Sequence, residues 1–232
     1  MAVRSRLESR AASYEYHPRE HLDRRRRGAR GLSAPTTLYF VRHGESVANA
    51  DHVFAGQRDS PLTPRGREQA KVVAKALEPV HFDRIVTSTL SRTRDTAAEI
   101  AAGRDVLVEA FDDLKEIDLG EAAGRPFDEM RGLPNYDGEG FTQWPGGESL
   151  DQVVTRAMRL IDGLVRESPG QTICIVGHGG VTRILVSKFM GVLPKLIRVP
   201  ATNTNITVAT FDQQNGYMIQ EMFKDSHVAE IA

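Results

Sequence analysis

The nine residues LYFVRHGES, at positions 38 to 46, place an arginine and a histidine directly after a short apolar run. A second apolar run, ICIV at positions 173 to 176, is followed by Gly177-His178-Gly179. Runs of this length are typical of strands buried on both faces of a parallel sheet. Ligands of open parallel sheets bind outside the carboxyl ends of the strands, and glycine beside a histidine permits close approach of a substrate. The two histidines therefore predict an active site at that end.

Outward from these two runs, strand patterns alternate with helical ones. Two closing strands are joined by a hairpin across Asn215-Gly216, a favoured turn pair. The alternation predicts an α/β fold with a mostly parallel sheet. We expect strands at 37–41, 84–87, 106–109, 172–176, 205–211 and 217–223, and helices at about 64–78, 92–102, 149–168 and 180–190.

Length and composition favour one domain with a basic extension. A chain of 232 residues with 40% hydrophobic residues can bury a full core, and we expect one domain over residues 35–232. Residues 1–34 carry nine Arg against four Asp and Glu, although the net charge of the whole chain is −1. Because this segment has few large apolar residues, we expect it to be disordered or loosely docked.

Three roles stay open for the basic extension: a solvated tail, an attachment to nucleic acid or anionic lipid, and a contact with a protein partner. The extension lacks the interleaving of basic and aromatic residues that stacks bases, so no nucleic acid is expected. The sequence leaves a homo-oligomer open.

The single cysteine, Cys174, excludes an intramolecular disulfide and lies inside an apolar run, so a reducing compartment is the default. No stretch approaches the roughly 18 apolar residues that span a bilayer, and the N-terminus lacks the apolar core of a secretion signal. We therefore expect a cytoplasmic protein with no membrane span.

Cations and imidazoles gather at the expected strand ends. Arg42 and His43 follow the first strand, Arg92 lies just beyond the second, and His178 follows the fourth. A guanidinium group matches phosphate oxygens bidentately, and the Gly179-Gly180 turn opens a helix whose N–H groups attract negative charge. One such residue alone is more often structural, but four together favour an anion site for phosphate, sulfate or carboxylate.

Six motifs make a family resemblance visible, and they occur in the family's order over about residues 37–211. Together they resemble the histidine phosphatase superfamily, also called the phosphoglycerate mutase-like family. The resemblance implies a three-layer α/β/α sandwich around a mostly parallel central sheet. The motifs are VRHGES at 41–46, DSPLTPRGREQA at 59–70, TSTLSRTRDTA at 87–97, LKEIDLGEAAG at 114–124, PGGES at 145–149 and VGHGG at 176–180.

By this resemblance His43 is the nucleophile, which attacks phosphorus and forms a phosphohistidine, while Arg42, Arg92 and His178 hold the phosphoryl oxygens. A nucleophilic imidazole must be neutral. Its other ring nitrogen should therefore donate to a fixed acceptor, such as a nearby backbone carbonyl, and neighbouring arginines should lower its pKa.

The resemblance also implies the general acid/base. Several carboxylates crowd one loop, and Glu116 alone matches the family's acid position, in the pattern made with Leu114, Gly120 and Gly124. Asp113 or Glu121 would be the next candidates. Glu148 fits the N-terminus of a helix better than a catalytic role.

Two further positions match the family near the substrate. Asn49 matches a phosphate-binding position, although an asparagine just after a strand could equally cap a helix. Gly56 matches a substrate-binding position, but Val53 and Ala55 stand where the family usually has an arginine and a polar residue. The substrate side of the pocket therefore departs from the family pattern.

Within the family, the sequence favours hydrolysis of small phosphomonoesters, with broad specificity left open. The alternatives are a cofactor-dependent phosphoglycerate mutase and a phosphate-dependent binding or regulatory module. Arg131 is the only basic residue between Pro126 and Pro145, which offers little charge for a second phosphate. Five aromatic or long side chains could line the leaving-group pocket or pack a lid: Phe127, Met130, Tyr136, Phe141 and Trp144.

The usual metal-binding spacings, such as HExxH, paired CxxC and the EF-hand loop, do not occur in the sequence. The two arginines can supply the positive charge that a metal supplies in other phosphoryl-transfer sites. We therefore expect neither a metal nor a cofactor.

Overall fold

The computed structural model describes residues 34–132, 144–197 and 199–231. Nearly all of the predicted basic extension lies outside these residues, and so does the middle of the segment between Pro126 and Pro145. The division of the chain between residues 34 and 35 stays a prediction.

One six-stranded sheet forms the centre of the molecule, in the order β3-β2-β4-β1-β5-β6. The first four of these pair in parallel, whereas β5 runs antiparallel to both of its neighbours. The predicted mostly parallel sheet and the closing hairpin are confirmed. The strands are β1 Thr36–Arg42, β2 Arg84–Ser88, β3 Val108–Phe111, β4 Thr172–Gly177, β5 Ile206–Asp212 and β6 Gly216–Lys224.

The third strand lies two residues later than the apolar pattern indicated, at 108–111 instead of 106–109. Leu107 is 77% exposed, so this apolar residue does not belong to the core. The preceding loop is held by Arg104, whose guanidinium donates to the carbonyls of Leu77, Val80 and Ile100. The loop therefore ends later than the sequence suggested.

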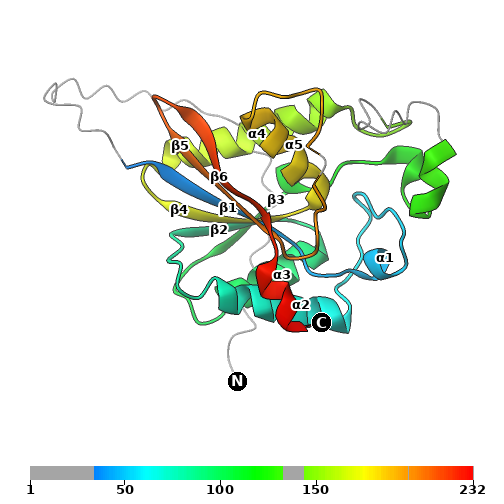
Figure 1. Ribbon diagram of the computed structural model, residues 1–232, viewed down its shortest axis with the longest axis horizontal. Coiled ribbons are helices and arrows are strands. Elements are labelled where there is room, and N and C mark those ends of the chain that lie inside the picture. Colours follow the sequence, from blue (N-terminus) through cyan, green and yellow to red (C-terminus); the bar gives the residue numbers. More distant parts are fainter. Residues whose placement is uncertain (1–33, 133–143, 198, 232) are drawn as a thin grey trace, which may run out of the picture.

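Two helices cover each face of the sheet, which confirms the three-layer sandwich (Figure 1). Alternate residues of β4 enter opposite layers: Ile173 and Ile175 pack with the first pair of helices, and Cys174 and Val176 with the second. The first pair is α4 Leu150–Glu167 and α5 Gly179–Phe189, and the second is α2 Pro64–Ala76 and α3 Ser91–Ala101.

The helix starts follow the expected chemistry. Thr63 accepts a hydrogen bond from the Gly66 amide at 2.9 Å, and Pro64 occupies the first turn of α2. Ser149 and Gln152 form a reciprocal capping box at the start of α4. A short helix, α1 Val47–Ala50, was not expected.

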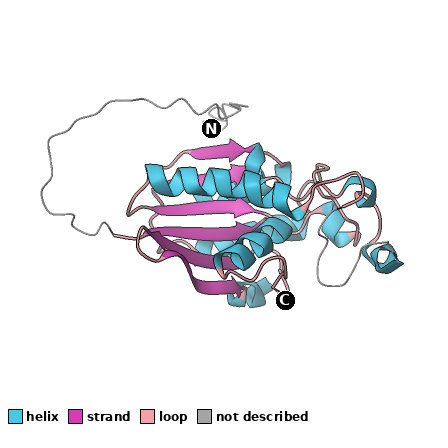
Figure 2. Cartoon of the chain, turned by 90° about the horizontal axis from the view of Figure 1, so that it is seen from above, coloured by secondary structure: helices cyan, strands magenta, loops and turns pink. Residues whose placement is uncertain are grey.

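The loops that follow β1, β2 and β4 gather beyond one end of the sheet, together with α1 and the short helical turns of residues 112–132 (Figure 2). The register of β1 against β4 pairs Arg42 with Gly177, so the residues that follow them meet at this end. The parallel pairing thus places the two glycine-flanked histidines together.

The loop after β1 packs tightly on the first turn of α2. A β-carbon added to Gly66 would lie 1.9 Å from the carbonyl oxygen of Glu45, and one added to Gly44 would lie 2.3 Å from the carbonyl oxygen of Gly66. Both contacts are to backbone, which cannot rotate away. Glycine is therefore required at both positions.

We expect Gly66→Ala to lower the free energy of unfolding by about 1–3 kcal/mol, because the backbone must shift to admit the methyl group. Gly163→Ala in α4 is the matched control, since nothing lies within 4 Å of its added β-carbon; there the better helix propensity should stabilise by about 0.5–1 kcal/mol. Urea unfolding of both variants measures the difference. Equal stabilities of Gly66→Ala and the wild type would show that the contact is not tight.

Candidate active site

His43 and His178 lie against each other at the carboxyl ends of β1 and β4. Their ring centroids are 5.2 Å apart and the rings stand at 65°. The His43 amide donates to the Gly177 carbonyl at 3.1 Å, which extends the strand pairing up to the site. Both side chains are buried, with relative exposures of 3% and 0%.

The ring of His43 is held in one orientation. Its Nδ1 lies 2.7 Å from the carbonyl oxygen of Gly44. Because a carbonyl can only accept, Nδ1 carries the proton and Nε2 keeps its lone pair. Burial lowers the pKa of His43 well below its usual value, and the charges of Arg42 and Arg92 lower it further. The imidazole is therefore neutral near pH 7, as the sequence predicted for a nucleophile.

His178 is buried without a hydrogen-bond partner for either ring nitrogen among the described residues. Burial holds its pKa well below the usual value, and Arg92, His43 and Arg42 add to the effect. A buried polar group without a partner is costly. A ligand that bonds to this ring would remove that cost.

The two predicted clamp arginines are oriented by backbone carbonyls. Arg92, only 2% exposed, donates to the carbonyls of Gly56 at 2.8 Å and Arg58 at 3.0 Å. Arg42 donates to the carbonyl of Ala201, and its Nε has no partner among the described residues. Burial lowers the pKa of Arg42 to about 10, so this guanidinium keeps its charge at neutral pH.

The Glu116 carboxylate occupies the N-terminus of α5. It accepts hydrogen bonds from the amides of Ile117 at 2.9 Å, Gly180 at 3.1 Å and Val181 at 3.2 Å. A β-carbon on Gly180 would lie 2.5 Å from this carboxylate, so a larger residue there would displace it. The helix N–H groups that the sequence assigned to a ligand are therefore bonded to Glu116.

Arg156 fixes the loop that carries Glu116, a role that was not predicted from the sequence. Its guanidinium forms an ion pair with Glu148, at 2.6 Å from Nε to Oε1, and the two side chains are only 14% and 17% exposed. Glu148 also accepts from the Asp118 amide at 2.8 Å. The remaining donors of Arg156 bond to three carbonyls of the loop, those of Asp113 (2.8 Å), Lys115 (2.7 Å) and Glu116 (3.1 Å).

Asn49 caps a helix, which is one of the two roles that its sequence position left open, and phosphate binding by Asn49 stays a prediction. Its side-chain oxygen closes the capping box of α1 by accepting from the Ser46 amide at 3.3 Å, and it also accepts from Asn203 at 3.1 Å. The same Asn203 amide donates to the carbonyl of His43. Because the oxygen of Asn49 is engaged, the amide nitrogen is the end that can donate to a ligand.

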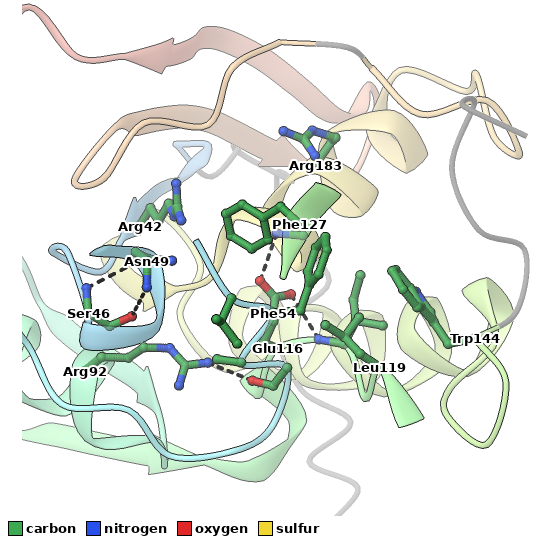
Figure 3. A pocket seen from close by; sticks show the side chains of 15 residues that line it. Arg42, Ser46, Asn49, Phe54, Arg92, Glu116, Leu119, Phe127, Trp144 and Arg183 are labelled. Atoms are coloured by element: carbon green, nitrogen blue, oxygen red, sulfur yellow. Dashed lines mark hydrogen bonds between the residues drawn. The ribbon is translucent and has the colours of Figure 1, made fainter. Parts of the chain in front are cut away.

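A cavity of about 240 Å³ opens beside these residues, lined by Arg42, Asn49, Arg92 and Glu116 (Figure 3). Gly56, with φ of +53°, also lines it. Of the other carboxylates considered, Asp113 instead pairs with Arg159, and neither Asp113 nor Glu121 lines the cavity. His43 and His178 are not lining residues either, because both are buried next to the arginines.

Aromatic residues form another wall of the cavity. Phe54, Phe127 and Trp144 line it, with ring centroids 4.5 Å apart for Phe54 and Phe127 and 6.1 Å apart for Phe54 and Trp144. The two predicted residues Phe127 and Trp144 thus line the pocket, and both pack on Phe54. The side chain of Met130, and all of Tyr136 and Phe141, lie outside the described residues.

Arg183 also lines the cavity, and it was not among the residues predicted from the sequence. It lies three residues after Gly180 in α5, and residues three apart share a helix face. That spacing from the VGHGG motif was a usable signal. The cavity therefore has a third guanidinium besides those of Arg42 and Arg92.

Across residues 34–132, 144–197 and 199–231, no group of three or more His, Cys, Asp or Glu side chains is placed to hold a metal ion. None of the helices in these ranges is long and apolar enough to cross a membrane.

The mostly parallel three-layer sandwich, with a glycine-flanked histidine after each of two adjacent strands, places this chain among phosphoglycerate mutase-like α/β proteins. The chain belongs to the histidine phosphatase superfamily (branch 1), whose family profile matches residues 38–222. The resemblance inferred from the six motifs is confirmed.

Known relatives include both phosphatases and a probable mutase. The adenosylcobalamin/alpha-ribazole phosphatase of Salmonella typhimurium is 33% identical over 66% of this chain and 79% of its own length. The probable phosphoglycerate mutase GpmB of Cronobacter sakazakii is 32% identical over 82% of this chain and 94% of its own length. A phosphoserine phosphatase from Entamoeba histolytica, solved with 3-phosphoglyceric acid, is 29% identical with a TM-score of 0.74, covering 83% of this chain and 99% of that one.

The depressed pKa values of the two buried histidines make stability depend on pH. Below the usual histidine pKa of 6.5 the unfolded chain takes up protons while both folded imidazoles stay neutral. The unfolded state then binds more protons, so stability that is present above this pH is lost as the pH falls.

We expect each of these histidines to lower the free energy of unfolding by up to about 1.4 kcal/mol per pH unit below that value. Urea unfolding at about pH 7.5 and about pH 5.5 measures the loss. His178→Gln should lose less stability between the two pH values than the wild type. Equal losses in the two proteins would mean that His178 is not held neutral.

Proposed function

We propose that this protein is a metal-independent phosphatase that hydrolyses small phosphomonoesters through a phosphohistidine on His43. The observation that carries the proposal is the fixed, neutral tautomer of His43, whose Nδ1 bonds to the Gly44 carbonyl while Nε2 keeps its lone pair beside two guanidinium groups. A nucleophile of this kind needs no base to remove a proton before it attacks.

In the first step, Nε2 of His43 attacks phosphorus and the bond from phosphorus to the ester oxygen breaks. Glu116, in its protonated form, gives its proton to the leaving oxygen. In the second step, a water attacks phosphorus and transfers a proton to Glu116, and the bond from phosphorus to nitrogen breaks. Inorganic phosphate leaves, and both residues return to their starting forms.

The phosphoryl oxygens are assigned to Arg42, Arg92, His178 and the amide nitrogen of Asn49. The unpartnered Nε of Arg42 and the unpartnered ring of His178 support this assignment, because each offers a buried N–H that has no acceptor among the described residues. Charge that spreads over the equatorial oxygens in the transition state is stabilised by such preorganised donors. Gly56 contributes by holding Arg92 through its carbonyl.

A phosphoglycerate mutase is the second candidate, because one relative at 32% identity is a probable mutase and because Arg183 adds a third cation to the cavity. A mutase must keep a bisphosphorylated intermediate in place. The wall formed by Phe54, Phe127 and Trp144 offers no charge for a second phosphate, which favours the phosphatase. Incubation with 3-phosphoglycerate and bisphosphoglycerate separates the two, since a mutase yields 2-phosphoglycerate and a phosphatase yields inorganic phosphate.

We expect the wild type to hydrolyse p-nitrophenyl phosphate equally well with and without EDTA, and to yield negligible 2-phosphoglycerate in the mutase assay. His43→Ala should show no turnover above background and no acid-labile phosphate on the protein. A rate that falls with EDTA would contradict the metal-independent mechanism. Undiminished labelling of His43→Ala would place the nucleophile elsewhere.

Glu116→Gln gives a sharper test of the acid/base. Because p-nitrophenolate leaves without a proton, the first step should survive while hydrolysis of the phosphohistidine slows by about 10²- to 10⁴-fold. A burst of p-nitrophenol and trapped phosphoprotein should follow. A wild-type steady rate in this variant would reject Glu116 and direct attention to Asp113 or Glu121.

The ion pair of Arg156 and Glu148 should act on the reaction through the position of Glu116. Arg156→Lys keeps the charge but loses the bidentate geometry and the bonds to the loop carbonyls. We expect kcat/KM for an alkyl phosphate, which reports the step in which the leaving oxygen needs the proton, to fall by roughly 10- to 100-fold. The kcat/KM for p-nitrophenyl phosphate, whose leaving group needs no proton, should fall less.

The matched control is Arg159→Lys on the same helix, where the side chain is 63% exposed. This substitution should leave both rates close to the wild type. If Arg156→Lys lowered the two kcat/KM values equally, the effect would be one on folding or on the nucleophile, and Arg156 would not position the acid.

A further inference from the structure

Arg183 is a guanidinium at the cavity that the phosphoryl-transfer steps do not use. It lies in the second turn of α5 and lines the cavity above Glu116, with Arg42 and Arg92 on other sides of that carboxylate (Figure 3). Its Nη2 donates to the carbonyl of Val199 at 3.0 Å, which fixes the direction of the side chain. Its Nε is buried and has no partner among the described residues.

The charge inside the cavity depends on the protonation of Glu116. Three guanidinium groups and one carboxylate line it. A bound phosphoryl group carries about two negative charges, so it balances the cavity when Glu116 is ionised. A general acid must instead carry its proton when the ester bond breaks, and in that state one positive charge has no counterpart.

We propose that Arg183 binds a carboxylate on the leaving group of the substrate, so that the preferred substrates are small phosphomonoesters of hydroxy acids. This inference rests on the proposed function and on the role of Glu116 as an acid. A guanidinium is well suited to a carboxylate because its donors match the two oxygens. The unpartnered Nε supplies one of these donors.

The size and the other wall of the cavity limit the rest of the leaving group. A volume of about 240 Å³ lies below the range of about 300–1,000 Å³ typical of pockets for drug-sized ligands. Phe54, Phe127 and Trp144 line the same cavity and offer apolar surface. A short carbon chain with one acidic end fits both conditions.

A simpler role for Arg183 is to balance the charge of Glu116. Burial lowers the pKa of Arg183, and the charge of Glu116 partly opposes this lowering, so the two groups interact. In that case Arg183 would affect every substrate alike, because Glu116 acts on every leaving oxygen. A pair of substrates that differ only in the carboxylate therefore distinguishes the two roles.

The pair is 3-phosphoglycerate and glycerol 3-phosphate, in which a hydroxymethyl group replaces the carboxylate. We expect the wild type to have the higher kcat/KM for 3-phosphoglycerate. In Arg183→Gln, the ratio of the two kcat/KM values should fall by roughly 10- to 100-fold, as for loss of a hydrogen bond to a charged group. Arg183→Lys should restore part of that ratio.

Lys188→Gln is the control, because it removes the same charge from the exposed end of the same helix; its ratio should equal that of the wild type. An unchanged ratio in Arg183→Gln, whether both kcat/KM values fall or neither does, would overturn the inference. So would a wild type that prefers glycerol 3-phosphate. If the wild type hydrolysed neither compound nor p-nitrophenyl phosphate, the proposed function itself would fail.

Discussion

Burying two guanidinium groups beside two imidazoles is the constraint on which the rest of this site depends. Removing a cation from water costs several kcal/mol unless the protein offers compensating groups. Here backbone carbonyls compensate: Arg92 bonds to those of Gly56 and Arg58, and Arg42 to that of Ala201. The imidazoles avoid the same cost by staying neutral. The sheet register that brings His43 and His178 together therefore also sets their protonation.

Glu116 is the anionic counterpart of this cationic cluster, and its position couples the proposed acid to α5. Its carboxylate accepts from the Gly180 and Val181 amides at the positive end of the helix. Protonation of Glu116 weakens those bonds, because amides donate more strongly to a carboxylate than to a neutral acid. The helix end then becomes able to attract another anion. The proposed protonated acid and a bound phosphoryl group would thus be compatible at this helix terminus.

Local sequence patterns predicted the residues that strand ends and helix starts position. They did not predict residues whose position depends on a contact between distant segments. His43, Arg42 and His178 follow apolar runs, so their place in the fold could be predicted from the residues alone, whereas Glu116 needed the family motif to separate it from Asp113 and Glu121. Arg156 could not be predicted, because helical periodicity does not indicate which polar residue turns inward. Its partners lie about 40 positions away in sequence, at Asp113 and Lys115. Such a contact requires the tertiary structure.

Two sides of the cavity are built from different parts of the fold. This difference explains why similarity to known proteins indicates the class of reaction better than the substrate. The proposed phosphoryl side is built from strand ends and from one helix terminus, which the sheet register fixes. The leaving-group side is built from loops and from one helix turn: Val53 and Ala55 depart from the family pattern there, and Phe127, Trp144 and Arg183 complete it. A phosphatase and a probable mutase match this chain at nearly equal identity, 33% and 32%. Overall sequence identity therefore does not indicate which of their substrates this chain would take. The residues of the leaving-group wall determine that specificity.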